Sequence, residues 1–464
     1  MKIFIKILCI AASVGMLLVF AGCNGGTKIN NPNGGTSGKN NTGKQTEIVF
    51  SNWGDSEEKK IFENVFDKFM ADNPDIKVKY LYIPHSEYIT KLNAMAATKT
   101  LPDIGQMIEF NSLQWAENEM FVDVRHLYDE GKIKPRLESV TFNKTDKGFL
   151  GSSFITEIYT LFYDKKYCDS MGVKVPATVD EAWTWDEFLN AAKKLTVDVN
   201  GKHPGETGFN PDKIKVYAIS DMPAELVALN NGGGIFNEDC TEIWLDKPET
   251  IKAFQMVADL MNVHYVAPRP ASRSAIGGGN NVLLTGKVAM SYAGQYNLLW
   301  YKQYIENGTL DIGFGVGPVL KNYVVTTSGP AIVVFKQSKN QEAAMKLLEY
   351  FYKTENIMDA IRSGLWMPSE KSYYENEKNI NDWIGNSKIH QNGYKTAVLD
   401  VARENAVAAL YYKLANYNEV MDIIYGPMDQ VWSGKKTAEA VIKNEIMPNL
   451  KNLMNSYWKE RNIK

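Results

Sequence analysis

The segment from residue 47 to residue 80 limits the fold of this chain more than any other part of the sequence. Residues 47–50 (EIVF) favour a strand, and a helical pattern follows in which Asp55 and Glu58 have the spacing of a capping box. Residues 76–80 then alternate between apolar and polar as a second strand does. A strand, a helix and a strand in this order predict a parallel α/β unit.

The same pattern recurs further along the chain. Residues 103–107 and 161–163 favour short buried strands, and residues 331–335 (AIVVF) are apolar throughout, which is typical of a strand buried on both faces. Thr184 and Glu187 form a second capping box before an amphipathic helix. Because 464 residues suffice for two domains with separate cores, we expect a two-domain α/β protein.

The start of the chain carries a targeting signal. Lys2 and Lys6 precede an apolar run at residues 7–20, which is shorter than the roughly 20 residues of a spanning helix. A short positive segment and an apolar run of this length are typical of a secretory signal peptide. We therefore expect a signal peptide at residues 1–22.

Ala21-Gly22-Cys23 closes the apolar run. A cysteine directly after small residues resembles the lipobox of bacterial lipoproteins, in which the thiol receives a diacylglycerol and the cysteine becomes the new N-terminus. The alternative is an ordinary signal peptide with an incidental cysteine. Residues 24–46 are rich in Gly, Asn, Thr and Ser, which predicts a flexible linker. We expect a lipidated Cys23 and a linker at residues 23–46.

Composition and charge exclude several functions. The formal net charge of −3 gives no indication of a nucleic-acid partner. Beyond residue 23 only Cys168 and Cys240 occur, and no CxxC or His/Cys cluster predicts a metal site. We favour two separate buried thiols over a disulfide, although the spacing leaves both open. The 10 Trp and 24 Tyr suit ligands with flat apolar faces and polar edges, but core packing accounts for most of these rings.

Several motifs, taken in chain order, resemble the sugar-binding class of bacterial extracellular solute-binding proteins. Each motif alone is weak, but together they extend from Ile48 to about Leu453 and keep the family's order. They are residues 161–165 (LFYDK), 184–188 (TWDEF), 286–290 (GKVAM), 315–318 (GVGP), 328–330 (SGP) and 367–369 (MPS).

The resemblance implies a two-lobe, periplasmic-binding-protein-like α/β fold of type II, in which crossing strands form a hinge between the lobes. The crossings are expected near residues 159–163, 282–290 and 331–335. The implied boundaries are 47–160 plus 288–335 for the first lobe and 161–287 plus 336–464 for the second.

The function implied by the resemblance is that of a substrate-binding lipoprotein of an ABC importer. Such a protein is expected to be a monomer, without cofactor, anchored by lipid on the extracellular face of the cell membrane. It would capture an oligosaccharide between its lobes and deliver it to the permease subunits of the importer.

Nine residues are candidates for contact with the ligand. Ligands of open α/β sheets bind beyond the carboxyl ends of the strands, where aromatic rings can stack on a sugar ring and polar groups can bind its hydroxyls. The candidates follow expected strands or lie in the motifs above, and core or surface packing is the alternative for each. They are Trp53, Glu109, Glu157, Tyr159, Asn231, Gln295, Tyr296, Trp300 and Trp366.

Other functions remain open at this point. An extracellular lipoprotein glycoside hydrolase or polysaccharide lyase would need paired carboxylates. A chain with 54 acidic residues contains such pairs by chance, so their presence alone decides nothing. A sensor subunit that feeds a membrane receptor would need the same binding fold, and ligands such as peptides or polyamines also occur in the broader superfamily.

Overall fold

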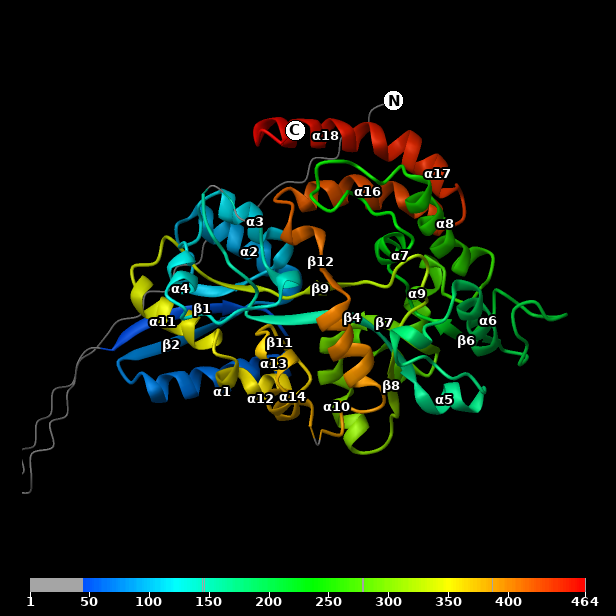
Figure 1. Ribbon diagram of the computed structural model, residues 1–464, viewed down its shortest axis with the longest axis horizontal. Helices are drawn as coiled ribbons and strands as arrows, with labels where there is room; N and C mark the ends of the chain where they lie inside the picture. Colours follow the sequence, from blue (N-terminus) through cyan, green and yellow to red (C-terminus); the bar gives the residue numbers. More distant parts are fainter. Residues whose placement is uncertain (1–44, 144, 146, 278, 386, 464) are drawn as a thin grey trace, which may run out of the picture. The chain divides into compact units, whose positions relative to one another are not determined.

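The computed structural model describes residues 45–463, apart from 144, 146, 278 and 386. These residues form one compact unit that is built on two β-sheets (Figure 1). The predicted signal peptide, Cys23 and residues 24–44 of the predicted linker lie outside the described residues. The first strand begins at Thr46, inside the predicted linker range.

The smaller sheet and its helices form the first lobe. Its strand order is β10-β3-β1-β2; β1 is parallel to both β2 and β3, whereas β10 is antiparallel to β3. This pairing confirms the predicted parallel unit. The strands are β1 (Thr46–Asn52), β2 (Ile76–Tyr82), β3 (Ile104–Met107) and β10 (Ala331–Val334). The helices of this part of the chain are α1 (Ser56–Asp72), α2 (His85–Ala97), α3 (Glu109–Glu117), α4 (Arg125–Asp129), α11 (Gln341–Phe351), α12 (Met358–Arg362), α13 (Ser372–Glu375) and α14 (Glu377–Ile384).

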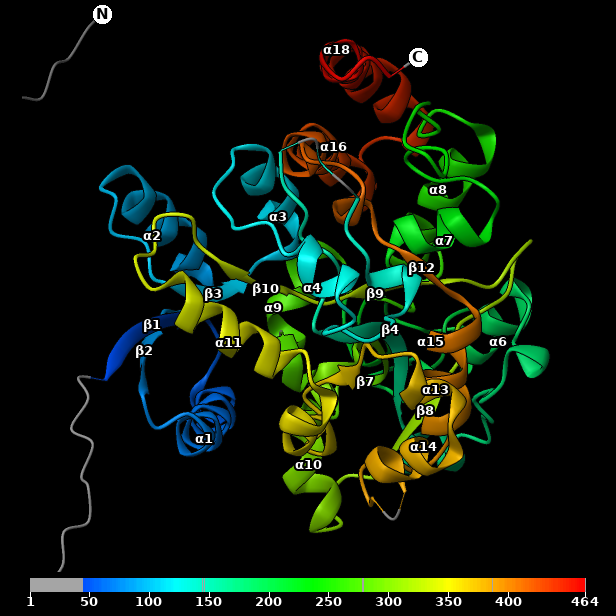
Figure 2. The same cartoon turned by 60° about the vertical axis from the view of Figure 1, so that its left-hand side comes forward.

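Helices cover both faces of this sheet. Phe50 of β1 stacks on Phe351 of α11 with ring centroids 5.3 Å apart, and Phe66 of α1 packs against Phe50 at 4.9 Å. The next residue, Ser51, points to the other face and hydrogen-bonds to the hydroxyl of Tyr88 in α2 at 2.9 Å. Figure 2 shows α1 and α2 on opposite sides of the strands.

The larger sheet and its helices form the second lobe. Its main path is β12-β9-β4-β7-β6-β5, and β8 and β11 also pair with β4. The strands are β4 (Ile155–Asp164), β5 (Val197–Asp198), β6 (Ile214–Ile219), β7 (Val288–Gly294), β8 (Ile312–Gly315), β9 (Val325–Ser328), β11 (Met367–Pro368) and β12 (Ala406–Ala408). The helices are α5 (Lys165–Ser170), α6 (Trp185–Leu195), α7 (Ala224–Asn230), α8 (Pro248–Asn262), α9 (Arg273–Ile276), α10 (Leu298–Glu306), α15 (Val401–Glu404), α16 (Tyr417–Trp432), α17 (Ala438–Val441) and α18 (Met447–Glu460).

Strand β4 connects the two halves of the structure. The first half of the strand pairs with β9 and β11, and the second half pairs with β7 and β8. Gly329 and Pro330 then separate β9 of the larger sheet from β10 of the smaller one. A Cβ at Gly329 would lie 2.7 Å from the carbonyl oxygen of Ile155, so the two segments approach each other more closely than a side chain allows.

The division of the chain between the lobes differs from the predicted one in two segments. The first is residues 288–328, predicted in the first lobe: its strands β7, β8 and β9 all pair with β4 of the larger sheet, and α10 lies between β7 and β8 in the chain. The second is residues 341–384, predicted in the second lobe: α11 packs on β10 and β1 of the smaller sheet, and α12, α13 and α14 follow it in the chain. Hydropathy patterns indicate where strands and helices occur, but not which sheet each of them joins, so these two assignments needed the structure.

The C-terminal helices contact both lobes. Arg461 forms an ion pair with Glu117 of α3 in the first lobe, and Trp458 donates a hydrogen bond of 2.9 Å to the carbonyl oxygen of Cys240 in the second. In both views α16 lies between α3 and α8 (Figures 1 and 2), and it contacts each of them.

Cys168 and Cys240 are both buried and free, which confirms the expectation of two separate thiols. Among residues 45–463, with the four gaps noted above, no helix is long and apolar enough to cross a membrane. The same residues contain no group of His, Cys, Asp or Glu side chains that could hold a metal ion.

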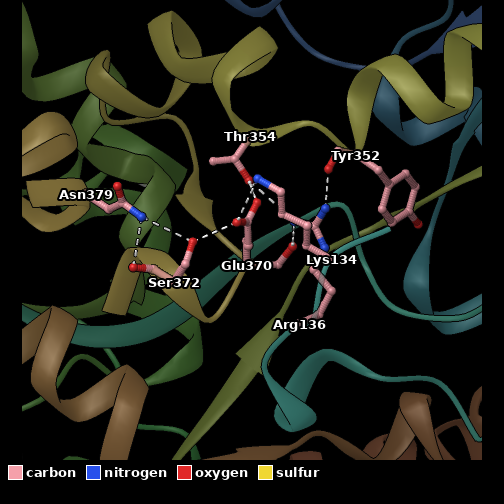
Figure 3. A network of polar contacts seen from close by, with 8 residues as sticks. Lys134, Arg136, Tyr352, Thr354, Glu370, Ser372 and Asn379 are labelled. Atoms are coloured by element: carbon pink, nitrogen blue, oxygen red, sulfur yellow. Dashed lines mark hydrogen bonds and ion pairs between the residues drawn. The ribbon is translucent and has the colours of Figure 1, made fainter. Parts of the chain in front are cut away.

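A buried polar network lies in the first lobe, next to β11 (Figure 3). Arg136 is 6% exposed and donates hydrogen bonds to Thr354 Oγ1, to Ser369 Oγ and to the carbonyl oxygen of Tyr352. Glu370 is 3% exposed and pairs with Arg136 in an isolated antiparallel bridge. The network thus holds the residues after β11 against residues 135–137.

Candidate ligand-binding site

A cavity of about 270 Å³ lies at the carboxyl end of β7. Tyr159 of β4 and Tyr296, which follows β7, are the two predicted site residues that line it. The remaining lining residues come from the loop after β6, from α9 and the residues that follow it, from β7 itself and from the segment after β7. They include Ser220, Asp221, Arg273, Ser291, Tyr292 and Asn297.

The ladder between β4 and β7 brings the two tyrosines together. Tyr159 is the partner of Gly294 in this antiparallel pair. The ring of Tyr296 folds back over Gly294, where a Cβ would lie 2.0 Å from a ring carbon. Only glycine at position 294 therefore leaves the Tyr296 ring room to lie beside Tyr159.

Glu157 lies on the same face of β4 as Tyr159, because alternate residues of a strand share a face. Its Cα partner in β9 is Ser328, and the Ser328 hydroxyl donates a hydrogen bond of 3.0 Å to Oε1 of Glu109. The backbone N–H of Gly329 donates to the same oxygen at 3.1 Å. Two of the predicted carboxylates, Glu109 and Glu157, are therefore neighbours.

Burial raises the pKa values of these carboxyl groups. For Glu157 the pKa lies well above its usual range, mainly because of desolvation and further because of the negative charges of Glu109 and Glu58. Burial also raises the pKa of Glu109, although its hydrogen bonds to Ser328 and Gly329 act in the opposite direction. Desolvation raises the pKa of Glu58 to about 7.

The two predicted tryptophans Trp53 and Trp300 lie close to the start of α1. Trp53 directly follows β1, as expected, and packs edge-on against Tyr88 with ring centroids 5.1 Å apart. Trp300 of α10 donates a hydrogen bond of 2.5 Å from its indole nitrogen to Oδ2 of Asp55, the residue that caps α1. Trp300 thereby connects the second lobe to the first. Its ring also packs edge-on against Tyr296 at 6.1 Å.

Three predicted site residues have structural partners instead. Trp366 is 3% exposed and packs edge-on against Phe62 and Phe154 in the core. Asn231 is buried at the end of α7 and donates a hydrogen bond of 2.8 Å to the carbonyl oxygen of Glu249. Gln295 is fully buried and donates to the carbonyl oxygen of Gly364 at 3.1 Å. The structure does not bring these three residues to the cavity.

The structure adds residues that the sequence reasoning missed. Phe110 of α3 is 40% exposed and stacks on Tyr417 of α16 at 5.5 Å. Tyr425, also of α16, is 49% exposed and donates a hydrogen bond of 2.6 Å to Oε1 of Glu225 in α7. The charges of Glu225 and Glu109 and the hydroxyl of Tyr159 all raise the pKa of Tyr417, after desolvation, so these groups share one region. Nothing in the hydropathy pattern of the sequence indicated that the apolar side chain of Phe110 would be exposed.

The charge of this region is one-sided. Among the described residues, no Lys, Arg or His forms an ion pair with Glu58, Glu109, Glu157 or Glu225. Arg273 lines the cavity, but its guanidinium donates to Oδ1 of Asp221 at 3.0 Å. The site therefore offers aromatic rings, hydroxyls and carboxyl groups, and its one cation already has an acidic partner.

Known proteins resemble this chain over most of its length. The sn-glycerol-3-phosphate-binding periplasmic protein of Shigella dysenteriae is 20% identical over 422 residues, which are 86% of this chain and 91% of the relative. An ABC substrate-binding protein from Listeria monocytogenes, solved in complex with cycloalternan, has a TM-score of 0.71 at 24% identity and covers 89% of this chain and 100% of its own.

A solute-binding protein of an ABC transporter from Thermotoga lettingae, solved with α-D-tagatose, has a TM-score of 0.70 at 20% identity and covers 88% of this chain and 100% of its own. These likenesses confirm the predicted two-lobe fold. The three proteins bind different solutes, so the likeness does not identify the ligand of this chain.

The family profile described as "Bacterial extracellular solute-binding protein" matches residues 64–386, which is more than two thirds of the chain. Proteins of this family bind solutes for ABC transporters and are not enzymes, which argues against the glycoside hydrolase and lyase alternatives. The chain belongs to the bacterial extracellular solute-binding proteins.

Proposed function

We propose that this protein is the substrate-binding lipoprotein of an ABC importer and that it captures an extracellular oligosaccharide between its lobes. The observation that carries the proposal is the convergence of aromatic rings and carboxyl groups at the cavity beside Tyr159 and Tyr296. Rings stack on the apolar faces of sugars, and carboxylate oxygens accept hydrogen bonds from their hydroxyls.

The absence of an available cation separates this proposal from a phosphate-bearing ligand. Proteins bind phosphate groups with Arg or Lys side chains or with helix N-termini. The only Arg or Lys among the described residues that line the cavity is Arg273, which Asp221 neutralises. An uncharged sugar does not need a counter-ion and fits this site better than a sugar phosphate does.

Hinge closure would couple binding to transport. Glu109 of α3 in the first lobe lies beside Glu157 of β4, so a ligand bound to both carboxyl groups would contact both lobes and favour the closed state. The permease subunits could then distinguish the loaded protein from the empty one. We propose that the protein works as a monomer, with the lobe boundaries given above apart from the two corrected segments.

The lipid anchor is part of the proposal and has its own test. Changing Cys23 to Ala should release the protein from membranes, because the thiol that would carry the diacylglycerol is gone. If the Cys23→Ala protein still sediments with salt-washed membranes, the lipoprotein assignment fails. The retained cysteines Cys168 and Cys240 are buried, so they cannot substitute for Cys23.

The ligand assignment is tested by titration calorimetry against neutral oligosaccharides of different linkage and length, with sn-glycerol 3-phosphate as the anionic comparison. We expect binding of at least one oligosaccharide and no binding of glycerol phosphate. Binding of glycerol phosphate alone would overturn the assignment. Release of a shorter product from the bound oligosaccharide would instead revive the hydrolase alternative.

A further inference from the structure

The carboxyl group of Glu157 lacks a partner within the protein. Among the described residues it takes part in no side-chain hydrogen bond and no ion pair. Desolvation is the largest of the causes that raise its pKa. It lies two residues before Tyr159, on the face of β4 that carries the cavity lining. Glu157 is half-buried, so a ligand can reach a carboxyl group that the protein itself leaves without a partner.

The neighbours of Glu157 would disfavour its charge. Glu109 is held beside it by the hydrogen bonds from Ser328 and Gly329, and Glu58 acts on it with the same sign. Glu225 extends the acidic region towards α16. These carboxyl groups favour their protonated forms beside a neutral ligand, whereas a cation would favour the ionised form of Glu157 by supplying the opposite charge.

The rings around the carboxyl groups suit a cation that is attached to a sugar. Tyr159, Tyr296 and Trp300 lie on the side of β7, and the Phe110–Tyr417 stack lies on the side of α3. Aromatic faces attract cations as well as the apolar faces of sugar rings. Both properties are satisfied by a saccharide that bears an amino group.

We propose that the ligand is an amine-bearing saccharide whose ammonium group binds to the unpartnered carboxylate of Glu157, with Glu109 beside it. This proposal rests on the proposed function, since it concerns the same site. The proposed function names oligosaccharides in general as the ligand. The present proposal restricts the ligand to oligosaccharides that carry a positive charge at one position.

The test compares tetrasaccharides that differ in a single substituent. Titration calorimetry of the full chain would use α-1,4- and β-1,4-linked glucose tetramers and the matching tetramers with an amine at carbon 2. The N-acetylated tetramers are the controls for size. We expect the amine to bind at least about tenfold more tightly than its hydroxyl counterpart in the series that fits, as expected for a new charge pair in a partly desolvated site.

The variant Glu157→Gln keeps the size of the side chain and removes its charge. In this variant the advantage of the amine should fall to within about twofold of the hydroxyl counterpart, because the partner of the ammonium group is gone. Glu306→Gln, an exposed change on α10, is the matched control for the loss of one negative charge and should keep the full advantage.

The outcomes separate this inference from the proposed function. If the hydroxyl tetramers bind as tightly as the amines, or if the advantage survives in Glu157→Gln, the amine proposal is wrong while oligosaccharide capture stands. If no oligosaccharide of any series binds, the proposed function fails, and the amine proposal fails with it.

Discussion

Replacing Arg136 by Met tests how strongly the buried polar network holds the residues after β11 against residues 135–137. Arg136 and Glu370 are almost completely buried (Figure 3), and Glu370 accepts hydrogen bonds from Thr354 at 3.0 Å and from Ser372 at 2.6 Å. After the substitution Glu370 keeps its ion pair with Lys134, whose Nζ lies 3.5 Å from Oε1 but whose side chain is 61% exposed.

The structure gives the size of the expected effect. The charges of Arg136 and Glu370 interact without direct contact between the two side chains. Removing one charge of a buried pair costs about 3–5 kcal/mol, because the remaining charge loses its compensation. Two of the three hydrogen bonds of Arg136 are long, at 3.3 and 3.4 Å, and Lys134 compensates Glu370 in part, so we expect the lower end, about 3 kcal/mol. For a lobe of this size that corresponds to a fall in Tm of about 6–12 °C.

Thermal unfolding of Arg136→Met, Glu370→Gln and the double variant would measure this effect. The double variant should lose less stability than the sum of the two single variants, because neither charge is then left alone. Arg362→Met is the control: this exposed arginine pairs with Asp382, and its loss should cost less than about 1 kcal/mol. The reasoning is refuted if the single variants lose no more stability than the control. It is also refuted if the loss in the double variant equals the sum of the losses in the two single variants.

Three further predictions follow from the site. Trp366→Ala should lower the free energy of unfolding by about 3–5 kcal/mol, because it empties a core position. Trp53→Ala should leave thermal unfolding nearly unchanged. It should weaken ligand binding in calorimetry by about 1–3 kcal/mol, by analogy with bases stacked on aromatic rings. Glu58, with a pKa raised to about 7 by burial, stays protonated in the folded state while the unfolded chain ionises, so stability should fall as the pH rises from about 4.5 to 7; urea unfolding of Glu58→Gln should show a shallower fall. Trp300→Phe removes the hydrogen bond to Asp55 but keeps a ring, so small-angle scattering should show a larger radius of gyration for the variant than for the parent protein, and equal radii would contradict a role in holding the lobes together.

Local signals predicted the elements of the fold well but predicted their partners poorly. The capping boxes at Asp55 and Thr184 are both present as expected, because each depends only on residues three positions apart. The sheets that β7 and α11 join differ from the expected ones, because β7 pairs with β4 and α11 packs on β1 across more than 100 residues of the chain. No local pattern in a sequence carries that information.

The candidate site shows the same limit. Trp53 directly follows β1 and Tyr296 is the second residue after β7, as expected from the sequence, since the end of a strand restricts where the next side chains can lie. Trp366 has an equally favourable position in the sequence, but Phe62 and Phe154 enclose its ring. Exposure depends on what packs over a residue, and for Trp366 those partners are about 200 and 300 residues away in the chain.

The arrangement of the site explains why binding and hinge motion should be coupled. Glu109 begins α3 of the first lobe, yet its carboxylate is held by Ser328 and Gly329, where the chain leaves β9 for β10. Glu157 lies opposite Ser328, in the strand that joins both halves of the structure. A ligand that binds these carboxylates therefore acts directly on the segments that must bend when the lobes open. Since a ligand can shift such an equilibrium only by its differential affinity for the two states, the same contacts that determine its affinity also determine how far the lobes close.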